Sequence, residues 1–385
     1  VGVGDLSGGG GTERYFADVF ERYKREPERH FDLTLITDVE SLARLQAVGR
    51  RIDPAYTLVV PTLGRITGLL RYGFSLLRLV MDRQFDLLHV ALVNPRYLLF
   101  LWLLGHFRTA KRPRIVINMV NVALAHTYGK PELCRSWPER KSYWLNRLFL
   151  RYLKLDGLYT WYRLFRDRHG KRLPGTPLVV AASCLFVDTD RFKPAVIKHN
   201  VVVWAGRLID VKQPLMFIDA LVMLRDLSSE LFANWVFRLY GAGPLEHKAH
   251  KAIADAHLGG NVTLTSSPSM HEVFAESRVF VSTHDFENFS SMSMLEAMSA
   301  GNAIIARPLG QTADWVKQGK NGLLSEEDTV ESLAGALLTC LSDESRLTSF
   351  GMCSREIATR EQCFDNVRRD LEAFWEAVLE RAPVN

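Results

Sequence analysis

Residues 287–301 read E-N-F-S-S-M-S-M-L-E-A-M-S-A-G and follow a β-rich run, residues 278–282, and a polar turn. Apolar residues recur in this stretch at helical spacing, which predicts a helix that begins near Ser291 and ends at Gly301. A strand, a loop and a helix start in this order place backbone N–H groups and a positive dipole end at the carboxyl edge of a sheet. Glu287 and Glu296 bracket the helix start. Alone they could be a capped helix with a solvated carboxylate, so the neighbouring motifs decide.

Three further patterns of strand, loop and helix lie in the same half of the chain. The strand-like runs are residues 201–205, 237–240 and 302–306. The loops that follow them read Gly206-Arg207-Leu208-Ile209-Asp210-Val211-Lys212, Gly241-Ala242-Gly243-Pro244 and Gly310-Gln311-Thr312-Ala313-Asp314. This alternation is typical of a parallel α/β sheet.

The alternation extends over the whole chain and predicts two parallel sheets. The expected strands are residues 31–36, 58–60, 87–91, 114–119, 158–161 and 177–180 in the first half, and 201–205, 235–241, 262–265, 279–282 and 303–306 in the second. We place the hinge in residues 181–194. The expected domains are therefore residues 1–190 and 195–360, and residues 361–385 form a helix that crosses back to the first domain.

Taken together, the ordered motifs resemble the C-terminal half of family 4 glycosyltransferases of the GT-B fold. That family carries G-R-L…K, G-x-G-P, E-x7-E-A-M-A-x-G and G-G-x-x-E in this order, and the counterparts here span about residues 200–330. The resemblance implies an α/β fold of two Rossmann-like domains that face a central cleft. It also implies a retaining, metal-independent transfer of sugar from a nucleoside diphosphate sugar, UDP or GDP, to a glycan or lipid-linked acceptor.

The sequence departs from the family pattern in two places. Eight residues instead of seven separate Glu287 from Glu296, so the loop has an extra residue or Asn288 takes the first position. We favour the extra residue, because Glu287 lies at the usual distance from its strand. In the last motif, Gln311 replaces the second glycine and Asp314 replaces the glutamate.

The second half supplies most of the candidate site. A diphosphate leaving group without a metal needs cations and N–H dipoles, for which Arg207 and Lys212 are candidates. Gly241 and Gly243 allow a close backbone approach. By resemblance, Glu296 accepts the ribose hydroxyls and Glu287 approaches the donor sugar as a catalytic residue. The remaining candidates are the backbone N–H groups that line the diphosphate, at Ser290, Ser291 and Met292.

The first half contributes two less specific candidates. Residues 8–11 are glycines that precede a helical pattern, and by resemblance Gly10 and Gly11 face the diphosphate and the acceptor. A flexible leader is the alternative. His126 is the second candidate, because many relatives place a histidine near the donor sugar after the corresponding strand. Here Asn118 or Asn121 takes that place, so His126 could be an ordinary loop histidine.

No metal and no cofactor is expected. Asp188-Thr189-Asp190 spells a D-x-D pattern, but it lies in the predicted hinge, in a context that resembles the family's V-D-x-x-x-F-x-P connector. The five cysteines form no C-x-x-C pair, which argues against a zinc site or a disulfide framework and favours a reducing cytosol.

The charge of the chain is divided between its halves. Residues 1–200 carry 32 Lys and Arg against 18 Asp and Glu, a balance of +14, and residues 201–385 carry 16 against 25, a balance of −9. The basic half predicts an anionic partner, and no nucleic-acid motif accompanies it. We expect a cytoplasmic protein, peripheral at an anionic inner membrane face through the amphipathic residues 65–83.

Three remaining observations limit this interpretation. The apolar run of residues 96–108 is too short to span a bilayer, which needs about 20 residues, and a buried helix is its simpler explanation. The chain begins at Val1 without Met, so an upstream segment is expected to be missing. The alternative functions are a GT-B phosphorylase or trehalose-type synthase on soluble sugars, and a catalytically inactive GT-B binding module.

Overall fold

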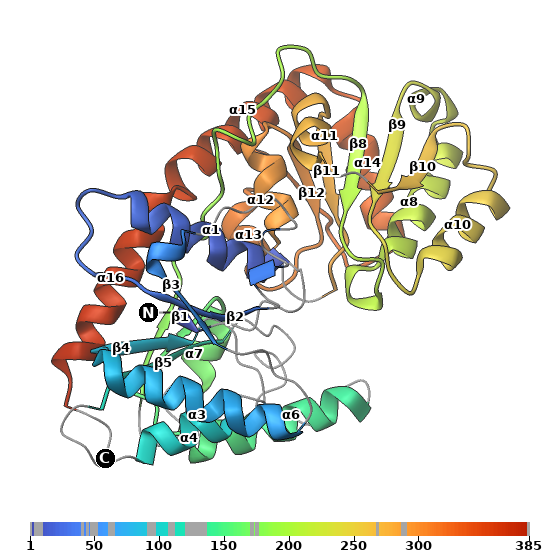
Figure 1. Ribbon diagram of the computed structural model, residues 1–385. Coiled ribbons are helices and arrows are strands. Elements are labelled where there is room, and N and C mark those ends of the chain that lie inside the picture. The colour runs from blue at the N-terminus through green and yellow to red at the C-terminus, as the bar shows by residue number, and fades with distance from the viewer. Residues whose placement is uncertain are drawn as a thin grey trace. The chain divides into compact units, whose positions relative to one another are not determined.

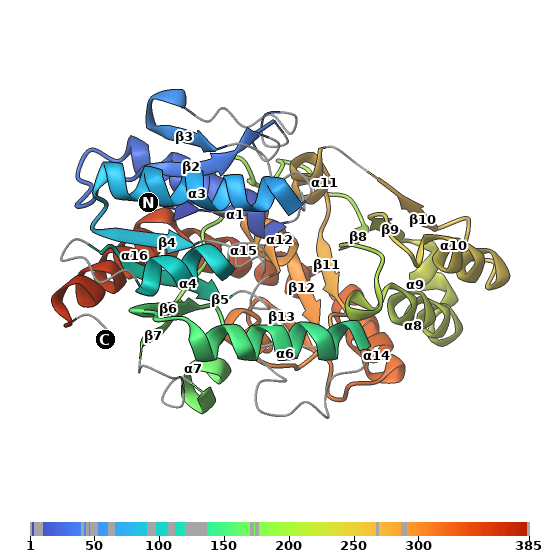
Figure 2. The same ribbon diagram turned by 60° about the horizontal axis from the view of Figure 1, so that its bottom comes forward.

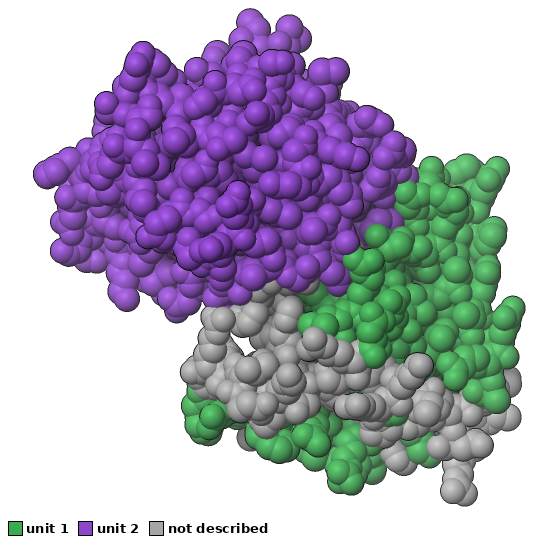
Figure 3. All heavy atoms as spheres, turned by 180° about the vertical axis from the view of Figure 1, so that it is seen from behind, with its two compact units in different colours: residues 1–183, 364–385 green, residues 184–363 purple. Residues whose placement is uncertain are grey.

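The computed structural model (Figure 1) describes residues 2–3, 11–39, 42–43, 46, 53–60, 66–90, 98–106, 112–119, 137–169, 173, 177–266, 269–285 and 291–382. The chain forms two compact units, coloured separately in Figure 3. Unit 1 comprises residues 1–183 and 364–385, and unit 2 comprises residues 184–363. The first change of unit falls between Ser183 and Cys184, inside the segment 181–194.

Unit 2 is built on a parallel sheet with strand order β10-β9-β8-β11-β12-β13. Its strands are β8 (Val201–Ala205), β9 (Val236–Tyr240), β10 (Val262–Thr265), β11 (Val279–Ser282), β12 (Ala303–Ala306) and β13 (Gly322–Leu324). β11 and β12 are buried along their whole length, as expected for inner strands of a parallel sheet.

Helices cover both faces of the unit 2 sheet. α8 (Pro214–Leu227) packs against α9 (Ser229–Ala233), α10 (Glu246–Asp255) and α14 (Val330–Leu341). α12 (Met292–Ser299) packs against α11 (Met270–Glu276) and α15 (Glu344–Glu361), and the short α13 (Thr312–Trp315) follows β12. Alternate strand residues, such as Val202 and Trp204, join the core under α8 and α14.

Unit 1 contains a second parallel sheet, with strand order β3-β2-β1-β4-β5-β6-β7. Its strands are β1 (Gly2–Val3), β2 (Leu35–Asp38), β3 (Thr57–Val60), β4 (Leu87–Val90), β5 (Arg114–Met119), β6 (Gly157–Thr160) and β7 (Leu178–Ala181). The helices are α1 (Gly11–Arg25), η1 (Pro54–Tyr56), α3 (Ile66–Arg83), α4 (Leu98–His106), α6 (Trp137–Tyr152), α7 (Arg163–His169) and α16 (Phe364–Glu380).

The C-terminal helix α16 packs on unit 1. The buried His89 of β4 accepts a hydrogen bond from Trp375 Nε1 (3.0 Å) through Nδ1 and donates one to Asn118 Oδ1 (3.0 Å) through Nε2. Burial lowers the pKa of His89 to about 4, so the ring is neutral and can make both bonds. Tyr23 of α1 donates to the buried carboxylate of Glu372 (2.6 Å). The predicted return of the C-terminal helix to the first domain is confirmed.

Several predicted strands agree with the structure at both ends. β5, β8, β10, β11 and β12 have the predicted bounds, whereas the prediction for residues 31–36 overlaps β2 only at Leu35 and Ile36. β1 and β13 were missed, because two or three residues are too few to show a period of two.

None of the described helices is long and apolar enough to cross a membrane. The apolar run 96–108 contains α4, whose Phe100, Leu101 and Leu104 are buried, as the buried-helix interpretation predicts.

Candidate active site

The candidate site lies where the strand order of the unit 2 sheet reverses. The chain proceeds from β8 outward to β9 and β10, and then returns to the other side of β8 for β11, β12 and β13. Ligands of open α/β sheets bind at the carboxyl ends of the strands at such a switch point. The loop after β8 carries Arg207 and Lys212, and the loop after β11 leads to α12.

Arg207 and Lys212 lie in the turn between β8 and α8. The turn ends in a 3-10 helix, Asp210–Lys212, and in Gln213, whose left-handed φ of 48° precedes Pro214 at the start of α8. The side chain of Lys212 runs past Gly206, where an added Cβ would lie 3.6 Å from Lys212 Cδ.

The electrostatics of this turn favour an anion. Burial, together with the neighbouring charge of Arg207, lowers the pKa of Lys212 to about 8. Among the residues that the structure describes, neither side chain has a carboxylate or a hydrogen-bond partner. Two cations held together without a counter-charge are stabilised when an anion binds between them.

The turn is fixed from the end of β11. The hydroxyl of Thr283 lies 2.8 Å from the carbonyl oxygen of Lys212 and 3.0 Å from that of Gln213, and it accepts a hydrogen bond from Trp204 Nε1 (2.8 Å). The backbone N–H of Asp285 donates to the carbonyl oxygen of Val211 (3.1 Å). The loops on the two sides of the switch point are therefore bonded directly to each other.

Arg307 extends this network. It is not among the site residues predicted from the sequence. It directly follows β12, its side chain is buried, and its Nη1 donates to the carbonyl oxygen of Thr283 (2.9 Å). Its Nε also forms an ion pair with Asp328. The only sequence signal was an arginine directly after an entirely apolar strand, at the edge where ligands bind.

Gly241 and Gly243 allow the turn after β9 to pack against the turn after β8. A Cβ on Gly241 would lie 1.9 Å from the carbonyl oxygen of Gly206, and one on Gly243 would lie 2.6 Å from that of Leu208. The backbones are also bonded, since the N–H of Leu208 donates to the carbonyl oxygen of Ala242 (3.0 Å). Both glycines thus position the backbone that carries Arg207.

The helix predicted after β11 is α12. Ser291 is its N-cap residue, and Gly301 follows its C-cap residue with a left-handed φ of 69°. Met294, Leu295 and Met298 are buried, whereas the side chain of Glu296 is only half-buried. Ser291 and Met292 therefore form the start of the helix at the carboxyl edge of the sheet, with Glu296 one turn further along.

Several predicted site residues lie outside the described residues. They are Gly10, His126, Glu287 and Ser290. Gly11 is the first residue of α1. Their roles stay predictions.

The D-x-D pattern forms a turn of the connector. Asp188 Oδ1 accepts hydrogen bonds from the backbone N–H groups of Asp190 (3.2 Å) and Arg191 (3.1 Å). Arg355 Nη1 donates to the carbonyl oxygens of Thr189 and Phe192, both at 2.9 Å. No group of three or more His, Cys, Asp and Glu residues that could hold a metal ion occurs in the described part of the chain.

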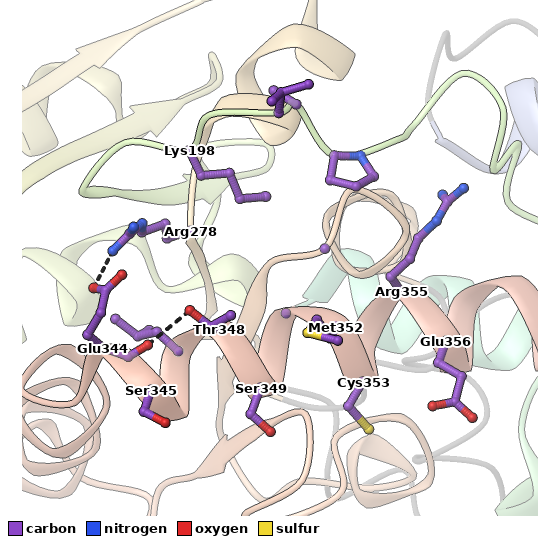
Figure 4. A pocket seen from close by; sticks show the side chains of 16 residues that line it. Lys198, Arg278, Glu344, Ser345, Thr348, Ser349, Met352, Cys353, Arg355 and Glu356 are labelled. Atoms are coloured by element: carbon purple, nitrogen blue, oxygen red, sulfur yellow. Dashed lines mark hydrogen bonds and ion pairs between the residues drawn. The ribbon is translucent and has the colours of Figure 1, made fainter.

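A surface hollow of about 1420 Å³ lies at the opposite, amino-terminal edge of the same sheet (Figure 4). Its lining includes Lys198, which precedes β8, and Arg278, which precedes β11. Lys198 Nζ donates to the carbonyl oxygen of Ser277 (2.5 Å), and Arg278 forms an ion pair with Glu344. These cations are already satisfied, so this hollow does not serve as the anion site.

A comparison with known proteins finds a family model that matches part of the chain. Residues 199–343 match the family model described as Glycosyl transferases group 1. The match covers 145 of the 385 residues and lies within unit 2. The matched segment contains the Arg207–Lys212 turn, both glycines and the whole of α12, so it includes all of the described candidate residues except Gly11.

Two curated relatives match part of the chain. A poly(ribitol-phosphate) alpha-N-acetylglucosaminyltransferase of Staphylococcus aureus (strain COL) is 28% identical over 162 residues, which is 41% of this chain and 31% of the relative. A GDP-mannose-dependent alpha-(1-6)-phosphatidylinositol monomannoside mannosyltransferase of Mycobacterium tuberculosis (strain CDC 1551 / Oshkosh) is 27% identical over 210 residues, 49% of this chain and 53% of the relative. The matches thus span about a third to a half of these relatives.

Solved structures resemble the chain over nearly its whole length. Sucrose-phosphate synthase from Thermosynechococcus elongatus has a TM-score of 0.75 at 14% identity, covering 98% of each chain. HepE from Anabaena, solved with UDP and glucose, has a TM-score of 0.70 at 15% identity, covering 98% of this chain and 99% of its own. The predicted α/β GT-B fold with two parallel sheets is confirmed.

Proposed function

We propose that the protein transfers a sugar from a nucleoside diphosphate sugar to a glycan or lipid-linked acceptor, without a metal ion and with retention of anomeric configuration. Unit 2 binds the donor in this proposal, and unit 1 binds the acceptor. The observation that carries it is the pair Arg207 and Lys212, which lies at the switch point of the sheet without a counter-charge among the described residues.

The two cations suit the charge that develops on the leaving group. Cleavage of the bond to the donor sugar leaves a nucleoside diphosphate, whose terminal phosphate gains negative charge in the transition state. Arg207 offers a planar fork to two phosphate oxygens, and Lys212 supplies a compact charge from an ammonium group whose pKa is lowered to about 8. Because the turn is already fixed by Thr283 and Arg307, little reorganisation accompanies the reaction.

The remaining residues take roles at the donor and the sugar. Glu296 accepts hydrogen bonds from the two ribose hydroxyls, since one carboxylate can accept both at once. The N–H groups at the start of α12 face the diphosphate. Glu287 lies against the donor sugar, and His126 and the Gly10–Gly11 loop act from unit 1. The departing phosphate takes the proton of the acceptor hydroxyl.

The names of the relatives indicate which donor and acceptor classes to test first. Names among the relatives specify a GDP-mannose donor and a poly(ribitol-phosphate) acceptor, and HepE was solved with UDP. UDP and GDP sugars are therefore the donors to test first. Acceptors that carry phosphate, either polymers or lipids, fit the basic composition of residues 1–200.

Thermal unfolding with UDP, GDP, ADP and TDP identifies the nucleotide, because a ligand at 100 times its Kd stabilises a protein by about 2.7 kcal/mol. Hydrolysis of the matching nucleotide sugar then shows whether the site is active. We expect one base to be preferred and its sugar nucleotide to be slowly hydrolysed. Stabilisation without any hydrolysis or transfer would identify a binding module instead, and no stabilisation by any nucleotide would contradict the proposal.

A further inference from the structure

The helix α6 of unit 1, labelled in Figure 2, carries large side chains that are exposed. Trp137 is 73% exposed, Trp144 and Leu148 are each 55% exposed, and Tyr152 is 56% exposed, whereas Tyr143 is buried. Large apolar side chains are normally the buried part of a surface helix. This helix therefore exposes a stripe that is suited to an apolar or interfacial environment.

A second stripe of basic residues runs beside the first. Trp137, Trp144 and Leu148 have the spacing i, i+7 and i+11, and Arg140, Arg147 and Arg151 repeat that spacing three residues later. At 3.6 residues per turn, the exposed residues from 137 to 152 fall within about 140° of the helix surface and extend over about 23 Å. A hollow of about 580 Å³ lies along this face.

The cations of this face are available to a partner. Arg140, Lys141, Arg147 and Arg151 are exposed, and none of them forms an ion pair with a carboxylate in the described part of the chain. Lys141 lies 5.7 Å from the ring centroid of Trp137, and Arg147 lies 5.5 Å from that of Trp144. The aromatic rings and the cations thus form one mixed surface.

We infer that α6 docks the chain on an anionic lipid bilayer, with the Trp137–Trp144–Leu148 stripe at the headgroup level and the arginines on lipid phosphates. Tryptophan and tyrosine favour this interface because each ring has an apolar body and a polar edge. A helix that combines Trp and Leu with Arg and Lys lies in the interface plane. The inference concerns where the protein acts, and it stands independently of sugar transfer.

The structure favours α6 over α3, which contains most of the segment predicted from the sequence. On α3, Phe74 is 67% exposed, but Arg78 is paired with Asp82 at 3.5 Å. That pairing offsets the charge of Arg78, whereas Arg83 at the end of α3 is exposed. The α6 face combines exposed aromatic residues with four cations that have no carboxylate partner among the described residues, so it is the better match to anionic lipid.

The test uses the whole chain and vesicles of phosphatidylcholine alone or in equal mixture with phosphatidylglycerol, measured by co-sedimentation. The basic variant is R140Q/R147Q/R151Q, the aromatic variant is W137S/W144S, and the matched control on α3 is F74S/R78Q. Because all these side chains are exposed, thermal unfolding and nucleotide binding should match the wild type in every variant, which separates this test from that of the proposed function.

We expect binding to the anionic vesicles only, and a loss on the order of 100-fold in the basic variant, since each basic side chain contributes about fivefold. The aromatic variant should lose the binding that remains at high salt, and the α3 variant should bind like the wild type. Wild-type binding by both α6 variants, or loss in the α3 variant alone, would overturn the inference. So would binding to soluble inorganic polyphosphate without any binding to vesicles, which would identify a polyanion site, or a lipid-free dimer that the aromatic variant abolishes.

Discussion

Each of the two edges of the unit 2 sheet carries one lysine close to one arginine, but the two pairs differ in whether their cations have bonding partners. At the carboxyl edge, the pKa of Lys212 is lowered to about 8 by burial and by Arg207. At the amino edge, the pKa of Lys198 is lowered to about 7 by burial and by Arg278. Lys198 donates to the carbonyl oxygen of Ser277, whereas Lys212 has no such partner among the described residues.

This difference separates a structural cation from one that is available to a ligand. A shifted pKa alone would assign both lysines to functional sites, because burial produces the shift in each case. The hydrogen-bond and ion-pair partners of each lysine and its neighbouring arginine distinguish the two sites. Lys198 and Arg278 satisfy carbonyl groups and a carboxylate, and Lys212 and Arg207 remain available to a diphosphate.

The largest expected effect separates the two lysines by activity. Lys212→Ala and Arg207→Ala should each lower turnover at least about tenfold, because a lost contact to the leaving group costs about 2–4 kcal/mol of transition-state stabilisation. Lys198→Ala should retain wild-type turnover per folded molecule. Donor hydrolysis and transfer assays check this, and equal losses in Lys212→Ala and Lys198→Ala would remove the distinction.

The next effect tests how the carboxyl edge is assembled. Gly241→Ala places a Cβ 1.9 Å from the carbonyl oxygen of Gly206, so the backbone must move, at a cost of about 1–3 kcal/mol in the free energy of unfolding. Gly259→Ala is the matched control, because nothing lies within 4 Å of its added Cβ. Urea unfolding compares them. A harmless Gly241→Ala would show that the two turns do not need this close approach.

Nucleotide affinity should also depend on pH. A bound diphosphate raises the pKa of Lys212 above its free value of about 8, so affinity is full below pH 8 and falls as pH rises through it. From pH 7 to pH 9 the expected loss is about tenfold. Calorimetry of the nucleoside diphosphate should show this loss in the wild type and in Lys198→Met but not in Lys212→Met. The same loss in Lys212→Met would assign the titration to another group.

A smaller effect distinguishes the two glutamates at the carboxyl edge. Glu296→Ala should lower the affinity for the free nucleoside diphosphate about fivefold to tenfold, since it removes hydrogen bonds to the ribose, and the affinity for its sugar nucleotides should fall by the same factor whichever sugar they carry. Glu287→Ala should leave that affinity unchanged and lower transfer. Titration with the free nucleotide decides, and unchanged affinity in Glu296→Ala would contradict the ribose role.

Removal of metal ions is expected to have no effect on turnover. Turnover should survive EDTA, because Arg207, Lys212 and the start of α12 supply the positive charge, and Asp188 accepts hydrogen bonds within its own turn. The measurement is donor hydrolysis with EDTA and after Mg²⁺ or Mn²⁺ is added back. Restoration of a lost activity by either ion would show that a metal takes part.

Much of the fold could be predicted because it depends on local patterns. The runs 201–205 and 303–306 are apolar throughout, and the run 279–282 is apolar except for Ser282. All three coincide with strands, and Gly301 ends α12 as its position predicts. β13 could not be predicted in this way, since its three residues pair with β12 only through the tertiary fold.

The candidate residues of the site could be named from the sequence, but the hydrogen bonds between loops that hold them in place could not be predicted. Arg207 and Lys212 follow a recognisable strand, so the sequence could name them as candidates, and their role stays a prediction. The bond from Thr283 to Lys212 and the bond from Arg307 to Thr283 join loops that are 71 and 24 residues apart, and no local pattern predicts such bonds. The close approach of Gly241 to Gly206 likewise depends on how two turns meet.

The most direct measurement of the central claim is a cycle of calorimetric titrations with UDP and UMP, and with GDP and GMP, on the wild type, Arg207→Ala/Lys212→Ala and Lys198→Ala. If the cation pair binds the diphosphate, removal of the terminal phosphate should weaken binding strongly in the wild type and in Lys198→Ala, and hardly at all in the double variant. An equal loss in all three proteins would show that the terminal phosphate is bound elsewhere, and would contradict the assignment of Arg207 and Lys212.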